Sequence, residues 1–261
     1  GFCSVNMAAG GIYTIGGAFW EFGQPDWDRT KLFVMFGVAE DHDSNPIKMG
    51  LGKLKGRGAR VIGVNPIRTG YNAIADDWYG ITPGTDGLLI LSLLHCLLQA
   101  GKVDLEYLAR WTNAPLLVNE ADGPEKGLIL KNAESQPFVI DKRTGAPAPW
   151  DGKGVQPDLG ATWQGHRTVF QHMAERYLGP EYAPEAAAKV CGIDADDIER
   201  IALEMAHVAF KETITIDTEW TDWAGRKQSQ FIGRPVSMHA MRGISAHSNG
   251  FQTCRAIHLL Q

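Results

Sequence analysis

Three groups of polar, charged or conformationally free residues stand where predicted strands end or a predicted helix begins. In chain order they are Gly37, Val38 and Glu40; Asn65, Pro66 and Arg68; and Pro83, Gly84, Thr85 and Asp86. Arginine can pair with phosphate, a carboxylate can accept hydrogen bonds from the N–H groups of a purine edge, and a helix N-terminus attracts anions. Singly, Thr85 is more often a helix cap, Asp86 a first-turn acid and Arg68 a solvated charge. Together these residues predict a nucleotide-bearing ligand.

The four cysteines are a second source of possible chemistry. None of Cys3, Cys96, Cys191 and Cys254 forms a CxxC pair, so the chain has no zinc or iron–sulfur spacing of its own. We expect Cys96, Cys191 and Cys254 to be reduced and buried as small apolar side chains. A thiolate is a good ligand for a soft metal. From the residues alone, Cys3 is either such a ligand or another buried thiol, and the second interpretation is the simpler one.

A β-α-β unit within residues 31–86 has to position the three polar groups. Apolar runs at 32–36 and 60–64 predict buried parallel strands, and the amphipathic segment 46–55 between them predicts a helix. Such units bind ligands in the crevice beyond the carboxyl ends of their strands. The GxGxxG fingerprint is absent, because Gly37 has no second glycine nearby. A nicotinamide cofactor is therefore disfavoured.

Further segments extend this unit into a doubly wound, mostly parallel, Rossmann-like α/β sheet. A short third strand is predicted at 75–80, and a β-branched strand at 214–217 is expected to close the sheet. Residues 219–250 are predicted to be rich in loops. Helices are predicted at 9–20, at 86–99 (with Thr85 as N-cap and Gly101 after its end), and at 105–111, 168–177, 184–190 and 194–208.

Residues 113–160 break the alternation of strands and helices. Gly, Pro, Asn, Lys and Asp interrupt short apolar runs in this stretch. This pattern predicts hairpins in an excursion from the main sheet, with one turn at residues 141–145. A linker to a separate domain is the alternative, but the stretch is short and apolar for a linker.

Composition narrows the classes of partner. The chain has 261 residues, a formal net charge of −5 and no basic run, which argues against nucleic acid. Its 44% apolar and 21% charged residues are typical of a globular protein with a sizeable core. The longest apolar run, at 87–98, is too short to span a bilayer. Because both ends fall within patterned sequence, we expect a piece of a longer polypeptide.

Five motifs carry a resemblance to a known family. They are FGVAEDHDSNPI, VNPIRT, ITPGTDGLLILSLLH, VCGIDADDIERIALEMA and GISAHSNGFQTCRAIHLLQ. Together they resemble the molybdopterin oxidoreductases of the dimethyl sulfoxide reductase family. The resemblance implies a molybdenum (or tungsten) bis(molybdopterin guanine dinucleotide) cofactor. Residues 1–242 would be the third domain, which binds one dinucleotide, and residues 243–261 would begin the return into the second domain.

The same resemblance implies roles for individual residues. Cys3 stands where many relatives have the protein ligand to the metal. Ser4 follows it where formate dehydrogenases of the family have histidine, which argues against formate oxidation. Ala39 and Asn45 also depart from the asparagine and histidine that are frequent in the loop after the first strand. Main-chain contacts to the dinucleotide can survive both changes.

Within the family, the chain resembles the large subunits of cytoplasmic, membrane-associated sulfite dehydrogenases. This implies oxidation of sulfite to sulfate by oxygen-atom transfer, with Cys3, Arg242 and His247 as catalytic residues. Arg226, Arg234 and His239 would help to form a cationic funnel for a small oxyanion.

Electrons would leave through an iron–sulfur cluster outside this chain and then through an iron–sulfur electron-transfer subunit. A membrane anchor subunit would complete the complex. A cytoplasmic location is expected, with the periplasm as alternative. Reduction of thiosulfate, tetrathionate, polysulfide or another oxyanion is the competing reaction. A non-catalytic α/β nucleotide-binding domain is the competing class for the isolated chain.

Overall fold

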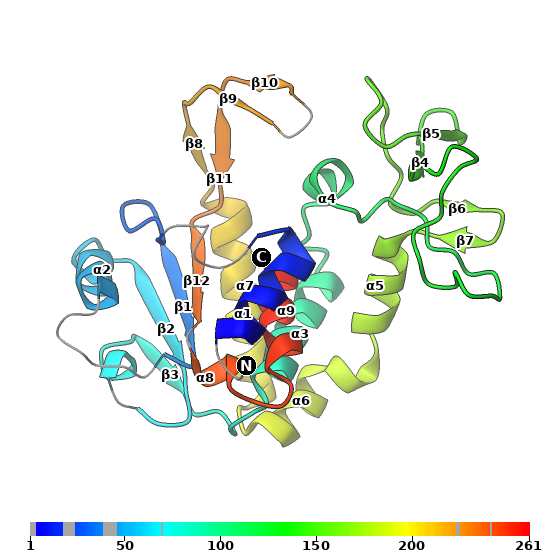
Figure 1. Ribbon diagram of the computed structural model, residues 1–261. Helices are drawn as coiled ribbons and strands as arrows, with labels where there is room; N and C mark the ends of the chain where they lie inside the picture. The colour runs from blue at the N-terminus through cyan, green and yellow to red at the C-terminus, as the bar shows by residue number, and fades with distance from the viewer. Residues whose placement is uncertain (1–3, 18–23, 39–45, 69, 223–224, 241) are drawn as a thin grey trace. The chain divides into compact units, whose positions relative to one another are not determined.

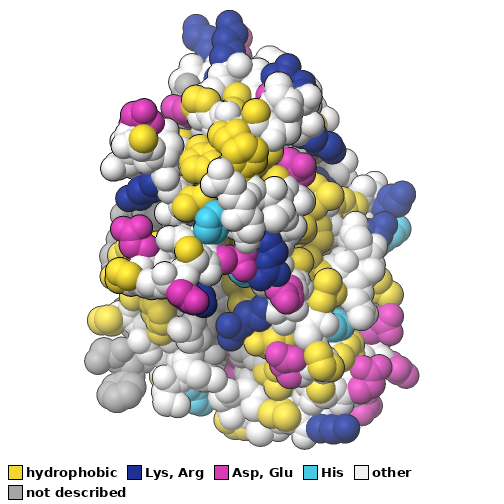
Figure 2. Space-filling model, turned by 90° about the vertical axis from the view of Figure 1, so that its right-hand side faces the viewer, with side chains coloured by type: hydrophobic (Ala, Val, Ile, Leu, Met, Phe, Trp, Pro, Cys, Tyr) yellow, Lys and Arg dark blue, Asp and Glu magenta, His cyan; other side chains and the backbone are white. Residues whose placement is uncertain are grey.

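The computed structural model describes the whole chain except residues 1–3, 18–23, 39–45, 69, 223–224 and 241. The chain forms two compact units. The first comprises Gly1–Ala100, Pro180–Trp220 and Lys227–Gln261, and the second comprises Gly101–Gly179 and Thr221–Arg226. Within the described part, no helix is long and apolar enough to cross a membrane. Acidic and basic side chains are interspersed on the face seen in Figure 2.

The first unit is built on a four-stranded parallel sheet with the order β12-β1-β2-β3. Its strands are β1 (Leu32–Phe36), β2 (Arg60–Val64), β3 (Asp77–Tyr79) and β12 (Val236–Ala240). Helix α2 (Pro46–Gly56) connects β1 to β2. The predicted β-α-β unit is therefore confirmed, with both strands at their predicted bounds.

Helices cover both faces of this sheet (Figure 1). Alternate side chains of β1 point to opposite faces: Phe33 and Met35 pack with α2, whereas Leu32, Val34 and Phe36 join the larger cluster. That cluster includes α3 (Asp86–Gln99), α6 (Pro184–Cys191), α7 (Ala195–Lys211) and α9 (Gly250–Leu260). The doubly wound α/β class is confirmed.

Helices α1 and α8 also belong to the first unit. Helix α1 (Ser4–Ile15) packs so closely on α9 that a Cβ on Gly10 would lie 2.7 Å from the Cβ of Cys254. It begins earlier than predicted and ends before Gly16, whose φ of +82° leaves the helical region. Helix α8 (Arg242–Ser245) follows β12, and the 3-10 turns η2 (Gly70–Ala73) and η3 (Pro180–Tyr182) precede β3 and α6.

One strand assignment was wrong. β8 (Ile214–Ile216) does not close the main sheet, because it pairs antiparallel with β11 (Phe231–Gly233) in a separate two-stranded sheet. The fourth strand is β12, which lies in the stretch predicted to be loops and pairs parallel with β1. All five β12 residues are half-buried, so the strand lacks the continuous apolar run that marks β1 and β2. Two short strands, β9 (Trp220–Thr221) and β10 (Lys227–Gln228), come between β8 and β11 in the sequence and pair with each other.

The second unit contains a predicted hairpin, in which β4 (Phe138–Ile140) pairs antiparallel with β5 (Pro147–Pro149). A further antiparallel hairpin, β6 (Thr162–Trp163) with β7 (His166–Arg167), lies beyond the stretch where hairpins were predicted. The predicted turn closes with a 2.8 Å hydrogen bond from the N–H of Gly145 to the carbonyl of Asp141. Helices α4 (Leu105–Trp111) and α5 (Val169–Tyr177) belong to the same unit.

Arg167 and Glu120 form the main ion pair of the second unit. The Arg167 guanidinium donates from Nε to Glu120 Oε1 (3.0 Å) and from Nη2 to Oε2 (3.1 Å), and its Nη1 reaches Glu175 Oε2 at 2.7 Å. Hydrogen bonding from Arg167 lowers the pKa of Glu120 from 4.5 to about 2. This bidentate pair ties β7 to the loop that precedes the hairpins.

The lowered pKa predicts acid sensitivity. The pair contributes fully above the unfolded-state pKa of Glu120 and is lost as the pH falls through its folded pKa of about 2. We expect Glu120→Gln to remove up to about 1 kcal/mol of stability at pH 7, because the pair is partly solvated, and to flatten the decline between pH 5 and pH 2. Thermal unfolding at stepped pH measures both effects; parallel pH profiles for the two proteins would refute the assignment.

Candidate functional site

The predicted polar groups start from one edge of the sheet. β1, β2 and β3 run parallel in adjacent positions, so their carboxyl ends lie side by side. The N–H of Gly37 donates to the carbonyl of Val64 (3.0 Å), and the N–H of Asn65 donates to that of Tyr79 (3.1 Å). The backbone ladder thus extends into the first residue of two loops and holds Gly37 and Asn65 in place.

The strand order reverses direction at β1, which makes this edge a topological switch point. The chain runs from β1 to β2 and β3 on one side and later returns to place β12 on the other. Open α/β sheets bind ligands outside the strand ends at such a point. Here α8 lies against the end of β1: a Cβ on Gly37 would lie 3.0 Å from Ile244 Cγ2 and 3.1 Å from Ile244 N. Gly37 also has a φ of +63°. Its backbone conformation and its close contact with Ile244 therefore both favour glycine at this position.

Asn65 carries an unpaired hydrogen-bond donor at this edge. The residue is 5% exposed, and its carbonyl accepts a 3.0 Å hydrogen bond from Trp78 Nε1. Its side-chain Nδ2 is buried without a hydrogen-bond partner among the described residues. A buried amide nitrogen left unpaired is unfavourable, and a ligand acceptor at the edge would satisfy it.

The other loop residues differ in exposure. Val38 is buried, whereas Pro66 and Arg68 are exposed beyond the end of β2. Glu40 lies outside the described residues. The backbone of Arg242 begins α8, but its side chain also lies outside the described part.

The third group forms a turn into α3. Gly84 has a φ of +83°, and its carbonyl accepts a 2.9 Å hydrogen bond from Asn249 Nδ2. Thr85 occupies the predicted N-cap position, but the expected side-chain cap is wrong. Its hydroxyl donates instead to the carbonyl of Thr82 (2.7 Å), within the turn.

Asp86 is a buried carboxyl at the start of α3. It is 6% exposed. Burial raises its pKa, whereas its own backbone N–H and the nearby His247 oppose the rise. The His247 ring also flanks the turn, because a Cβ on Gly84 would lie 3.6 Å from its Nδ1. The segment after α8 therefore brings His247 and Asn249 to the predicted Pro83–Asp86 group.

The N-terminal end of α1 lies at α8 as well. Asn6 Nδ2 donates to the carbonyl of Ser245 (2.8 Å), and Gly250 permits the close approach, since a Cβ there would lie 3.0 Å from Asn6 Nδ2. Cys3 lies outside the described residues, three positions before Asn6 in the sequence. Among the described residues, no group of three or more His, Cys, Asp or Glu side chains could hold a metal.

The five cations of the predicted funnel have separate surroundings. Arg226 belongs to the second unit, where its Nε donates to Asp222 Oδ2 (2.7 Å). Arg234 donates to the carbonyl of Ala209 (2.7 Å). His239 is a half-buried member of β12 whose pKa is lowered by burial. Of the five, the described side chains place only His247 beside the predicted Pro83–Asp86 group.

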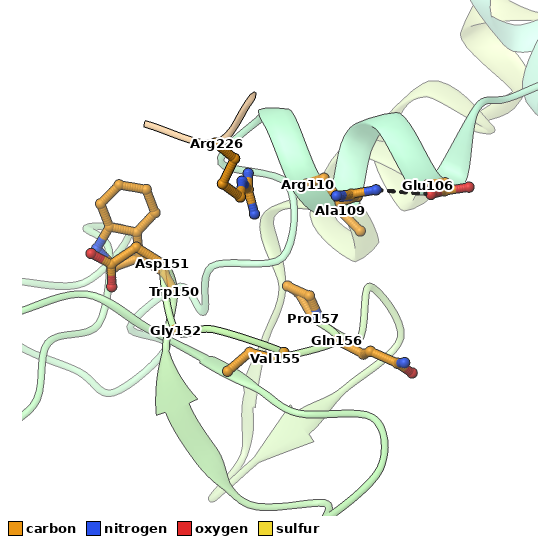
Figure 3. Close-up of a pocket in the computed structure, with 11 residues that line it drawn as sticks. Glu106, Ala109, Arg110, Trp150, Asp151, Gly152, Val155, Gln156, Pro157 and Arg226 are labelled. Carbon is orange, nitrogen blue, oxygen red and sulfur yellow. Dashed lines mark hydrogen bonds and ion pairs between the residues drawn. The ribbon is translucent and has the colours of Figure 1, made fainter. Parts of the chain in front are cut away.

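A cavity in the second unit is lined by Arg110 and Arg226 (Figure 3). Its volume is about 470 Å³. Both guanidinium groups lie over the Trp111 ring, at 5.6 and 5.2 Å from its centroid. Arg110 also pairs with Glu106 at 3.2 Å. The arginines that line this cavity are thus engaged with the unit's own side chains.

The three described cysteines are buried, as predicted. Burial raises the pKa of both Cys96 and Cys254 to about 11. It raises that of Cys191 as well, and the Cys191 thiol lies 3.6 Å from the carbonyl of Thr85. All three are free thiols, and the raised pKa values keep them protonated and unreactive near neutral pH.

Comparison with known proteins places these features in a family. The chain is 44% identical over 279 aligned residues to a sulfite dehydrogenase subunit of Allochromatium vinosum, covering 100% of this chain and 28% of that protein. It is 30% identical over 197 residues to a provisionally named dimethyl sulfoxide reductase catalytic subunit of Halobacterium salinarum, covering 68% of this chain and 22% of that protein. The chain belongs to the dimethyl sulfoxide reductase family of molybdopterin enzymes.

The resemblance stated from the motifs is thereby confirmed. The chain is homologous to the catalytic subunits of molybdopterin-dependent oxidoreductases and spans about a quarter of the length of these two relatives. The nitrate reductase alpha chain of Bacillus subtilis is a more distant relative, 26% identical over 193 residues, with 68% of this chain and 15% of that protein covered. No family model matches the chain.

A solved structure agrees on the fold. The chain superposes on acetylene hydratase from Pelobacter acetylenicus with a TM-score of 0.59 over 99% of this chain and 24% of that one. The sequences are 16% identical, so this match supports the architecture alone.

The described edge of this member of the family fits a nucleotide. Three consecutive loops supply an unpaired buried donor at Asn65, left-handed glycines at 37 and 84, and a buried carboxyl at Asp86. A nucleotide offers acceptors, phosphates that require close backbone approach, and base N–H donors, which are the complements of these groups.

Three residues at this edge went unrecognised in the sequence. Asn6, Asn72 and Asn249 each donate a side-chain hydrogen bond to a distant backbone carbonyl. Their partners are 239, 34 and 165 positions away in the chain. Only Asn249 had a local signal, since it directly precedes the first residue of α9.

The contact between Gly37 and α8 can be measured with a matched pair of substitutions. Gly58 has a φ of +79° and nothing within 4 Å of a built Cβ, so Gly58→Ala should cost about 1 kcal/mol for backbone strain alone. Gly37→Ala adds a clash with buried Ile244 and should cost about 2–3 kcal/mol. Urea unfolding compares the two, and equal losses would show that the α8 contact is unimportant.

Proposed function

We propose that this chain binds one molybdopterin guanine dinucleotide along the carboxyl edge of its sheet, within a catalytic subunit that oxidises sulfite to sulfate. The observation that carries the reaction is the 44% identity to a sulfite dehydrogenase subunit over the whole chain. The geometry that supports the binding mode is the set of complementary polar groups on consecutive loops at a switch point.

The binding residues divide by chemistry. The Asp86 carboxylate accepts hydrogen bonds from the N–H groups of guanine, and the Asn65 amide donates to a ligand oxygen or nitrogen. Arg68 pairs with a phosphate. The remaining residues supply backbone groups or close approach; they are Gly37, Val38, Glu40, Pro66, Pro83, Gly84 and Thr85.

Cys3, Arg242 and His247 serve the reaction centre in this proposal. The Cys3 thiolate is the protein ligand to molybdenum or tungsten, which suits a soft sulfur donor. The metal, held by two dinucleotides, supplies two-electron oxygen-atom transfer when bound. Arg242 and His247 attract and orient the sulfite anion. The hydrogen bond between Asn6 and Ser245 supports this arrangement by anchoring the start of α1 at α8.

The rest of the enzyme lies outside this chain in this proposal. Residues 1–242 form the dinucleotide-binding domain, and residues 243–261 begin the connection to another domain. Electrons pass to an iron–sulfur cluster elsewhere in the same polypeptide, then to an iron–sulfur electron-transfer subunit, and a membrane anchor subunit completes the complex. The complex lies at the cytoplasmic face of the membrane, with the periplasmic face as alternative. The isolated chain is inactive.

Reduction of an oxyanion is the second candidate, and the identity to a nitrate reductase alpha chain supports it. The substrate in this case would be thiosulfate, tetrathionate, polysulfide or another oxyanion. The same edge would hold the same nucleotide in this case, so the binding proposal is common to both reactions. An isolated, non-catalytic nucleotide-binding domain is the remaining alternative.

Substitution of Asp86 should separate stability from binding. Because burial raises the pKa of Asp86, the free energy of unfolding falls as the pH rises from the unfolded pKa of this group through its folded pKa. Asp86→Asn should therefore raise the melting temperature at pH 7. It should also lower guanine nucleotide retention by about 10- to 100-fold, because charged hydrogen bonds are lost.

The control is Asp104→Asn in the full-length subunit. Asp104 also stands at a helix N-terminus, where its carboxylate caps α4 by accepting from the N–H of Tyr107 (2.9 Å). Asparagine caps helices about as well, so this variant should keep both properties. Unchanged GMP release on acid hydrolysis of Asp86→Asn would exclude Asp86 from the binding site.

Cys3 and the substrate can be tested in one assay. The full-length subunit should reduce an artificial electron acceptor with sulfite and not with formate or thiosulfate. Cys3→Ser should lower this rate at least about 100-fold, since a hard oxygen ligand replaces a soft one, while GMP content stays near the wild-type value. A Cys3→Ser enzyme with full activity would refute the ligand role. Thiosulfate-dependent oxidation of a reduced artificial electron donor, without sulfite-dependent reduction of the acceptor, would favour the second reaction.

A further inference from the structure

Asn72 contacts Val38, the second residue after β1. The residue is fully buried in η2, between β2 and β3. Its Nδ2 donates a 2.6 Å hydrogen bond to the carbonyl of Val38, 34 positions earlier in the chain. Val38 is itself fully buried, so its carbonyl would lose this partner and stay shielded from water if the amide were removed.

Gly63 makes room for this amide. A Cβ on Gly63, in the middle of β2, would lie 2.2 Å from Asn72 Oδ1 and 3.1 Å from Asn72 Cγ. Glycine weakens the interior of a strand, and it often marks a place where another group approaches the backbone closely. Here the approaching group is the amide that holds Val38. Asn72 Oδ1 has no hydrogen-bond partner among the described residues. The hydrogen bond from Nδ2 to Val38 is therefore the only one described for this side chain.

The start of the loop is held from two directions. Asn72 holds the Val38 carbonyl, and the backbone of α8 lies against Gly37, where a Cβ on Gly243 would be 2.8 Å from the Gly37 oxygen. The Gly37 N–H is in turn bonded to Val64. The first two residues after β1 therefore have a fixed path before the loop continues.

We propose that Asn72 is a positioning residue for the proposed dinucleotide site, and that Gly63 is required only to admit its side chain. Asn72 acts through Val38: it sets the backbone at the point where the first binding loop leaves the sheet. This inference rests on the proposed function and assigns to it a residue that the loop motifs do not include.

The test uses the full-length catalytic subunit with its cofactor and four variants: Asn72→Ala, Gly63→Ala, the double variant, and Leu54→Val as control. Leu54 is fully buried in the same apolar cluster as Val38, so its truncation lowers stability without removing the hydrogen bond from Asn72 to Val38. Two quantities are measured. One is the rate at which guanine nucleotide, assayed as GMP, is lost from the protein. The other is amide hydrogen exchange in the peptide that contains Gly37 and Val38.

Asn72→Ala and Gly63→Ala should each speed nucleotide loss about tenfold, equivalent to about 1.4 kcal/mol, and should increase exchange at Gly37. Leu54→Val should lower the melting temperature and leave both rates unchanged. Because Gly63→Ala acts by displacing Asn72, the double variant should be no worse than Asn72→Ala.

Wild-type rates in Asn72→Ala, or an additive loss in the double variant, would overturn the inference. If the wild-type subunit holds no guanine nucleotide, the proposed function fails instead. In that case exchange at Gly37 alone decides whether Asn72 positions the loop: increased exchange in Asn72→Ala supports the role, and wild-type exchange removes it.

Discussion

Parallel pairing of the four main strands is the constraint on which the rest of the structure depends. Because β12, β1, β2 and β3 all run in one direction, their carboxyl ends meet at one edge. Four chain segments that are far apart in sequence therefore leave the sheet together. The ladder continues into Gly37 and Asn65, and α8 lies against Gly37. Backbone hydrogen bonds therefore hold the edge where the loops after β1 and β2 begin.

That edge contains two buried polar side chains that are energetically unfavourable in the folded chain alone. Asn65 has a buried donor with no described partner, and Asp86 is a carboxyl whose pKa is raised by burial. Each is unfavourable in the absence of a ligand. By contrast, the buried cysteines are protonated, and the arginines of the second unit's cavity are engaged with neighbouring side chains. The switch point thus combines an unpaired buried donor with a buried carboxyl.

Elements with a continuous apolar run were predicted from the sequence, whereas elements that depend on distant contacts were missed. β1, β2 and α3 were predicted at their observed bounds, because continuous apolar runs mark buried elements. β12 was missed because Ser237 and His239 interrupt its apolar residues and the whole strand is half-buried. The strand pattern predicted that the loops after β1 and β2 would begin at one edge, and the described strands confirm this. The sequence could not predict that Asn72 holds Val38, since nothing local links residues 34 positions apart.

The proposed position of the guanine, at the carboxyl edge of this sheet, can be tested by an experimental structure of the full-length protein with its cofactor. We expect a guanine base within hydrogen-bond distance of the Asp86 carboxylate, and an acceptor of the same ligand within reach of Asn65 Nδ2. A guanine bound elsewhere, with Asp86 and Asn65 covered by protein alone, would contradict it.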